Sequence, residues 1–176
     1  MRRVEAAGAL LVAASLACIL VACKSGDDSF RREVPIGARL QPLGGSVVRG
    51  AITFRPYEGG VVMSVTFGGV SSGPYRVAIH ATPNCTSTNG FSAGPPLLRA
   101  GSSEPIVAVV YTEGGSQGVV STVMRLPGVA LDGPAGVNGK SVVVHDRGTG
   151  PLDASPGVPN DRIACGVIGP LPPPFQ

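Results

Sequence analysis

The 176-residue chain lacks sustained helical periodicity, internal repeats and any cluster of basic residues. Its 26 glycines and 17 prolines interrupt most windows of helical length, which argues against a helical bundle or an α/β fold. Charged residues make up only 14% of the chain, and 14 basic against 11 acidic side chains leave a formal net charge of +3. Because positive and negative charges are nearly balanced and no basic cluster is present, we do not expect nucleic acid as a partner.

The N-terminal part of the sequence has the features of an export signal. Two arginines follow the initiating methionine, residues 6–22 form an unbroken run of apolar and small side chains, and Cys23 follows at once. This order is typical of a secretory signal, and the letters LVAC that end at Cys23 resemble the lipobox of bacterial lipoproteins. We therefore predict a lipoprotein signal peptide over residues 1–22 and a lipid on Cys23.

The predicted lipid places the chain on a membrane of the bacterial cell envelope. Lys24 stands where many lipoproteins of the inner membrane carry an aspartate, which favours the outer membrane and its periplasmic face. An uncleaved anchor is the alternative, because the 17 residues of the apolar run lie at the lower limit for spanning a bilayer.

Two polar or proline-rich segments flank the predicted domain. Residues 23–37 are charged and without periodicity, so we expect a flexible tether. Residues 170–176 are rich in proline and are predicted to form an extended tail. The remaining residues, 38–169, are enough for one domain with a sizeable core.

Short runs rich in valine, isoleucine and threonine recur along this domain, separated by turns that contain glycine. The predicted strands are 38–42, 47–56, 60–68, 74–81, 105–111, 117–126, 140–146 and 161–167. Eight short strands without a helical pattern predict an all-β fold, an eight-stranded antiparallel barrel or sandwich.

Alternation within two runs predicts which faces are buried. Val48, Ile52 and Phe54 share one face of their strand, and the odd-numbered positions of 61–67 share one face of the next. Glycine-rich segments follow both this first run and the run at 105–111. We therefore predict hairpin turns within residues 58–60 and 113–118.

Two cysteines remain for the folded domain, because Cys18 lies in the signal peptide and Cys23 is predicted to carry the lipid. An even pair in an exported domain is typical of a disulfide, so we predict a bond between Cys85 and Cys165. Closing a loop between positions 80 apart removes about 4–5 kcal/mol of chain entropy from the unfolded state. Two free thiols are the alternative.

Two runs near the C-terminus have a distinctive order. The run GKSVVVH, residues 139–145, ends in a histidine, and the run RIACGVIG, residues 162–169, has an arginine three residues before a cysteine. Together they resemble the C-terminal signature of the Cu,Zn superoxide dismutases. Residues 48–54, 73–80, 84–86 and 92–95 resemble other segments of that family in the same order. The resemblance implies a flattened eight-stranded Greek-key barrel.

The resemblance also assigns metal-site positions. His80 and His145 match copper ligands, but Ala78 stands where the copper strand of the family has a second histidine. Pro96 follows the sequence SAGP where the family has the histidine that bridges copper and zinc. Residues 97–113 match the zinc loop and contain no histidine or aspartate, so we do not expect zinc, which normally takes four protein ligands in a structural site.

Arg162 matches the arginine with which the family guides superoxide to copper, a role that requires bound metal. The alternative is an exposed arginine at the start of a strand, paired with Asp161 or Asp146.

The reduced ligand set leaves three functional hypotheses. The first, favoured by the residues, is an envelope module without dismutase activity, in which His80 and His145 are hydrogen-bonded and free of metal. The second is a protein that buffers or passes on copper through these two histidines. The third is a zinc-free copper dismutase that acts on superoxide with a third ligand of unidentified position.

Overall fold

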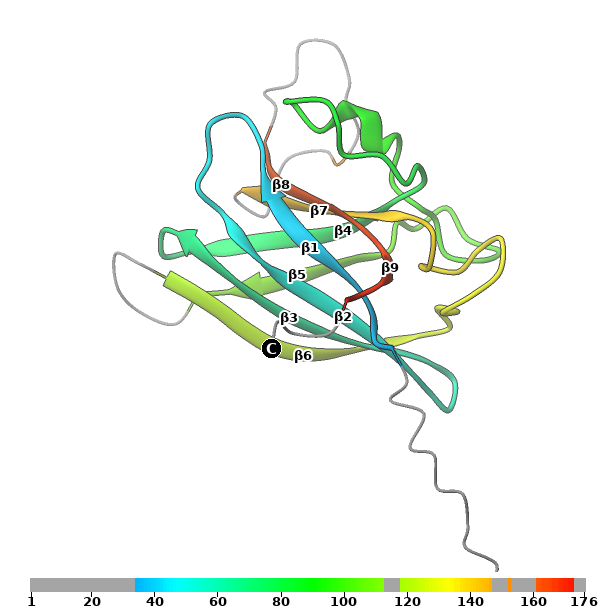
Figure 1. Ribbon diagram of the computed structural model, residues 1–176. Coiled ribbons are helices and arrows are strands. Elements are labelled where there is room, and N and C mark those ends of the chain that lie inside the picture. Colours follow the sequence, from blue (N-terminus) through cyan, green and yellow to red (C-terminus); the bar gives the residue numbers. More distant parts are fainter. Residues whose placement is uncertain (1–33, 113–117, 147–151, 153–160, 173–176) are drawn as a thin grey trace, which may run out of the picture. The chain divides into compact units, whose positions relative to one another are not determined.

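The computed structural model describes residues 34–112, 118–146, 152 and 161–172 (Figure 1). The predicted signal peptide and Cys23 lie outside the described residues, as do the tether up to residue 33 and residues 173–176 of the predicted tail. Within the described ranges, no helix is long and apolar enough to cross a membrane.

The described part of the chain is all-β, as the sequence predicts. Its strands are β1 (Ile36–Pro42), β2 (Arg49–Tyr57), β3 (Gly60–Val70), β4 (Pro74–His80), β5 (Val107–Tyr111), β6 (Gly118–Pro127), β7 (Ser141–Asp146), β8 (Arg162–Val167) and the two-residue β9 (Gly169–Pro170). A single 3-10 turn, η1 (Phe91–Ala93), is the helical element found there. All eight predicted strands are present, with ends within two residues of the prediction, and the predicted fold class is confirmed.

The strands form one antiparallel sheet in the order β5-β4-β7-β8-β1-β2-β3-β6, and β9 pairs with β1. Figure 1 shows the sheet curling back on itself. Its two end strands approach each other at one point, because a Cβ added to Gly118 of β6 would lie 3.0 Å from the side chain of Thr112, which follows β5. The sheet is therefore a nearly closed barrel.

One of the two predicted hairpins is confirmed and the other is wrong. β2 and β3 pair along their whole length up to Tyr57 and Gly60, with a tight turn at residues 58–59. In the described residues, however, β5 pairs with β4, and β6 pairs with β3. The connection at 113–117, which lies outside the described residues, therefore joins the two end strands of the sheet instead of closing a hairpin.

The barrel encloses the main apolar core and carries a smaller cluster outside it. Val48, Ile52 and Phe54 are at most 2% exposed, and the odd-numbered positions of 61–67 are at most 1% exposed, so both predicted faces are confirmed. The outer cluster consists of Leu43, Ala93, Val143 and Cys165, with Cys85 packed against it. This second cluster lies between the sheet and the loop formed by residues 81–96, here called the covering loop.

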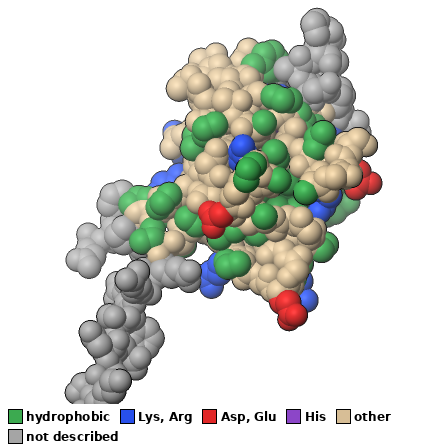
Figure 2. Space-filling model, turned by 90° about the vertical axis from the view of Figure 1, so that its right-hand side faces the viewer, with side chains coloured by type: hydrophobic (Ala, Val, Ile, Leu, Met, Phe, Trp, Pro, Cys, Tyr) green, Lys and Arg blue, Asp and Glu red, His purple; other side chains and the backbone are tan. Residues whose placement is uncertain are grey.

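The surface carries no dense charge on the side shown in Figure 2. Apolar side chains lie there in small groups, and the few charged side chains of both signs are scattered among polar surface. That face therefore offers no concentrated positive potential to a polyanion.

Candidate metal site

The two histidines lie on the outer face of the barrel wall. Every second residue of β4, beginning with Tyr75, belongs to the barrel core, so strand alternation places Arg76, Ala78 and His80 on the opposite face. β7 pairs antiparallel with β4 and sets His145 opposite Arg76. Both histidines are nevertheless 0% exposed. The two histidines thus lie in a buried layer between the outer face of the barrel wall and the residues packed over that face.

The two imidazole rings meet end to end. The Nε2 atoms of His80 and His145 lie 3.3 Å apart, the ring centres lie 5.5 Å apart and the ring planes differ by 19°. The centre-to-centre distance equals the Nε2–Nε2 distance plus about one ring radius at each end. Both Nε2 atoms therefore lie close to the line that joins the ring centres, and the rings point at each other rather than stacking face to face.

Ala78 provides the space for this meeting. On β4 it lies between Arg76 and His80, and its partner on β7, Val143, lies between Ser141 and His145. The two imidazoles reach toward each other along the strands from either side of this small residue. Ala78, at which the family resemblance implies a missing ligand, is thus the floor of the site.

Burial keeps both histidines neutral near pH 7. It lowers the pKa of His80 from 6.5 to about 4, in spite of a hydrogen bond to Gly94 that acts in the opposite direction. Burial also lowers the pKa of His145, against the hydrogen bond and the charge of Asp161. For Asp161, burial alone would raise the pKa, but its hydrogen bond to His145 and the charge and hydrogen bond of the Arg76 guanidinium lower it. Asp161 is therefore ionised.

The hydrogen-bond partners fix the tautomer of each ring. Nδ1 of His80 lies 2.8 Å from the carbonyl oxygen of Gly94, and Nδ1 of His145 lies 2.7 Å from Oδ1 of Asp161. A carbonyl and an ionised carboxylate only accept hydrogen bonds, so each Nδ1 must carry the proton. A neutral ring with a protonated Nδ1 has a lone pair on Nε2. The two lone pairs therefore face each other across 3.3 Å.

Asp161 is a site residue whose role the sequence does not reveal. Its second oxygen, Oδ2, accepts a hydrogen bond of 2.7 Å from Arg76. A bulge in β8 brings Asp161 next to His145 and Arg76. Val144 pairs with Ala164 while His145 pairs with Arg162, which leaves one extra residue on β8. Such a bulge bends the strand and redirects side chains next to it. The result is a chain of contacts from Arg76 through Asp161 to His145.

The covering loop is tied to the barrel at several points. The predicted disulfide is confirmed: Cys85 in the loop is bonded to Cys165 in β8, with a Cα–Cα distance of 5.7 Å. Gly94, whose carbonyl orients His80, has a φ of +74°, and a Cβ there would lie 2.5 Å from the hydroxyl oxygen of Thr82. A residue with a side chain would be strained in this backbone conformation and would also collide with its neighbour.

Arg162 is a buried contact of the covering loop. Its guanidinium donates to the carbonyl oxygen of Gly90 at 2.7 Å and to that of Leu152 at 3.2 Å, and it lies 5.1 Å from the ring centre of Phe91. The side chain is only 4% exposed, so the expectation of an exposed arginine at this position is wrong. The arginine that pairs with Asp161 is Arg76.

The donors at this site number two. Among the described residues there is no group of three or more histidine, cysteine, aspartate or glutamate side chains that could hold a metal ion. Pro96, for which the resemblance implies the position of a bridging ligand, forms an isolated bridge with the backbone of His80 and offers no donor atom from its side chain. Metal–imidazole bonds are about 2.0–2.1 Å long. A metal ion between the rings would thus require the Nε2 atoms to move apart by about 0.7 Å from 3.3 Å.

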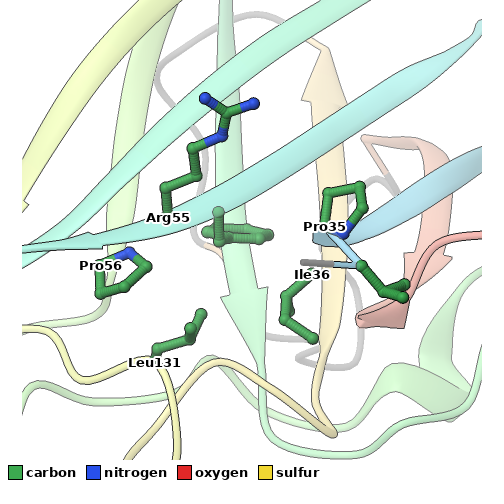
Figure 3. A pocket seen from close by; sticks show the side chains of 7 residues that line it. Pro35, Ile36, Arg55, Pro56 and Leu131 are labelled. Atoms are coloured by element: carbon green, nitrogen blue, oxygen red, sulfur yellow. The ribbon is translucent and has the colours of Figure 1, made fainter. Parts of the chain in front are cut away.

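A separate cleft lies where the described chain begins. It has a volume of about 390 Å³, and Pro35, Ile36, Phe54 and Leu131 are among the residues that line it (Figure 3). Arg55 is the charged residue of its lining, and Figure 3 shows its guanidinium extending away from the side chains of Pro56 and Leu131. None of the lining residues belongs to the histidine site.

Comparison with known proteins supports the fold. No protein-family model matches the chain. A solved structure described as that of the clock protein EA4 is similar, with a TM-score of 0.59 and 22% sequence identity over 78% of this chain and 95% of that chain. At this level of identity the likeness shows the fold alone, so the role of the histidine pair must be argued from its own chemistry.

Proposed function

We propose that the chain is a superoxide dismutase-like lipoprotein of the bacterial envelope that binds copper between His80 and His145 and lacks fast dismutase activity. The observation that carries this proposal is the pair of Nε2 lone pairs that face each other at 3.3 Å. Two neutral acceptors at this distance repel each other unless something with positive charge lies between them. A metal ion would turn this repulsion into two bonds.

The donor set favours copper over zinc. Imidazole nitrogen suits copper ions, and copper(I) accepts few ligands. Zinc usually takes four protein ligands in structural sites and three in catalytic sites. The described residues supply two donors here, and the stretch that resembles the zinc loop has no histidine or aspartate.

The same donor set argues against dismutation. A dismutase needs a copper ion that changes oxidation state repeatedly within a constant ligand shell. Here Ala78 and Pro96 replace two of the four copper ligands that the family resemblance implies. Arg162, the residue expected to guide superoxide, is 4% exposed and donates to two backbone carbonyls. Buried in this way, its guanidinium mainly contacts the covering loop and is poorly placed to bind an anion.

A copper titration of the full-length protein, followed by a superoxide assay of the loaded sample, tests the proposal. We expect one copper ion per chain, loss of that ion in His80→Gln and in His145→Gln, and no turnover above that of free copper. Saturable binding that persists in both variants would overturn the histidine site. Fast turnover that disappears in both variants would establish a zinc-free dismutase instead.

The second candidate is a module that binds no metal. The hydrogen bonds that the two rings donate to Gly94 and Asp161 hold both rings without any ion, which is the observation that favours it. Absence of histidine-dependent copper binding in the same titration would select it.

A further inference from the structure

We infer that the His80–His145 site is selective for copper in its monovalent, cuprous state and excludes cupric copper. This inference rests on the proposed copper site and specifies which ion that site takes. It follows from three features of the described residues: the direction of the two donors, the charges that surround them and the rigidity of the rings.

The direction of the donors suits an ion of low coordination number. Both Nε2 atoms lie close to one line, with their lone pairs opposed. Copper(I) has a filled d shell, imposes no ligand-field preference and readily accepts two opposed nitrogen donors. Copper(II) favours a square-planar or tetragonal arrangement of nitrogen and oxygen donors. Among the described residues, no third histidine, cysteine, aspartate or glutamate joins the pair to complete such a plane.

The charge of the surroundings penalises a divalent ion. Among the described residues, the charged groups that act on the two imidazoles are the guanidinium groups of Arg76 and Arg162 and the carboxylate of Asp161. They leave one positive charge in excess before any metal binds. The Born cost of burying an ion rises with the square of its charge, so a divalent ion pays about four times the cost of a monovalent ion of the same size. Both histidines are 0% exposed, so water does not relieve this cost at the rings.

The rings are held in place from both sides. The carbonyl oxygen of Gly94 accepts a hydrogen bond from Nδ1 of His80, and Asp161, itself held by Arg76, accepts one from Nδ1 of His145. Rotation of either ring toward a tetragonal arrangement would break one of these hydrogen bonds. Moving the rings apart along their common line by about 0.7–0.9 Å leaves the ring planes unchanged and breaks neither hydrogen bond, provided that Gly94 and Asp161 yield by a few tenths of an ångström. The two rings can thus accommodate an ion with two opposed ligands at a smaller cost in free energy than an ion that requires a planar set of ligands.

Competition titrations with each oxidation state test the inference. The protein is the full-length chain carrying Cys18→Ser and Cys23→Ser, because free thiolates bind copper(I) and would hide the histidine site. Copper(I) is supplied without oxygen, with ascorbate and a competing copper(I) chelator; copper(II) is supplied in air with a competing amino acid. Silver(I), which does not change oxidation state under these conditions, is the second monovalent probe.

We expect copper(I) and silver(I) to bind at one per chain, with copper(I) at least about 100-fold tighter than copper(II). X-ray absorption of the copper(I) sample should show two nitrogen neighbours. His80→Gln and His145→Gln should each lose this binding, and Asp132→Asn, a change in an exposed loop, should keep it.

The outcomes separate the two proposals. Histidine-dependent copper(II) binding as tight as that of copper(I), with a tetragonal electron paramagnetic resonance spectrum, would overturn the selectivity and leave the copper site standing. Failure of every ion to bind in a histidine-dependent way would overturn the copper site itself. Ala78→His supplies a gain-of-function check: a third imidazole at the floor of the site should raise the affinity for copper(II) relative to that for copper(I). An unchanged ratio in a folded variant would contradict the argument from donor number.

Discussion

Acidification should destabilise the metal-free protein through His80, and the structure gives the size of the effect. In the unfolded chain the pKa of this histidine is 6.5, whereas burial lowers it to about 4 in the folded protein. Between these two values the unfolded state binds a proton that the folded state does not bind. One pKa unit corresponds to about 1.4 kcal/mol, so the difference of about 2.5 units corresponds to about 3 kcal/mol of unfolding free energy.

The sign of the effect defines its pH window. The stability that depends on neutral His80 is fully present above pH 6.5, falls as the pH is lowered and is lost by about pH 4. The pKa of His145 is also lowered, so this residue adds to the loss in the same direction. Asp161 contributes at lower pH, because its depressed pKa preserves stability above its unfolded-state value of 3.8. The two histidines thus dominate the loss between pH 6.5 and pH 4.

Urea denaturation of the metal-free protein at a series of pH values measures this loss. Wild-type protein should lose at least about 3 kcal/mol of unfolding free energy from pH 7 to pH 4. His80→Gln, which does not titrate, should be less stable at pH 7 but should lose about 3 kcal/mol less over the same range. If the two proteins lose equal amounts, the buried imidazole does not carry the effect and the reasoning fails.

Three further results are expected. Asp161→Asn should weaken copper binding about 10–100-fold in a chelator competition, because an amide is a weaker acceptor for His145 than a carboxylate, while Asp132→Asn should leave binding unchanged; equal effects of both would contradict the role of Asp161. Replacing Cys85 and Cys165 by serine should lower the unfolding free energy by about 4–5 kcal/mol in urea denaturation, and a loss below about 1 kcal/mol would contradict the entropic estimate. Cys23→Ser should move the protein from the membrane to the soluble fraction of cells, and continued sedimentation with membranes would refute the lipid anchor.

The sequence predicts strands such as β2 and β3 because one face of each is buried, which gives their apolar residues a period of two. The buried faces of β2 and β3 follow directly from this alternation, and the ends of the strands were off by at most two residues. Pairing between strands is a different matter. Residues 105–111 and 117–126 are neighbours in sequence with a glycine-rich connection, yet each pairs with another strand. The pattern of apolar residues within a strand does not determine which other strand it pairs with.

The site was predicted in part, for a similar reason. The resemblance to a known family singled out His80 and His145, and the fold brings their Nε2 atoms to 3.3 Å. The contacts that fix their tautomers come from elsewhere in the chain. Gly94 and Asp161 reach the rings through a covering loop and a strand bulge, and neither has a signature in the sequence. Arg162 was expected at the surface because a charged residue at a strand start usually is, but loop carbonyls surround it.

If the chain is exported and binds copper as proposed, the position of the disulfide gives its maturation an order. Gly94 orients His80 from within a segment whose other end is anchored by Cys85 to Cys165. We expect a chain whose thiols are still reduced to hold this segment loosely, and therefore to present one oriented imidazole instead of two. For an exported chain, oxidation would then precede metal acquisition: copper encountered before secretion would find an incomplete pair, and only the cross-linked product would capture it.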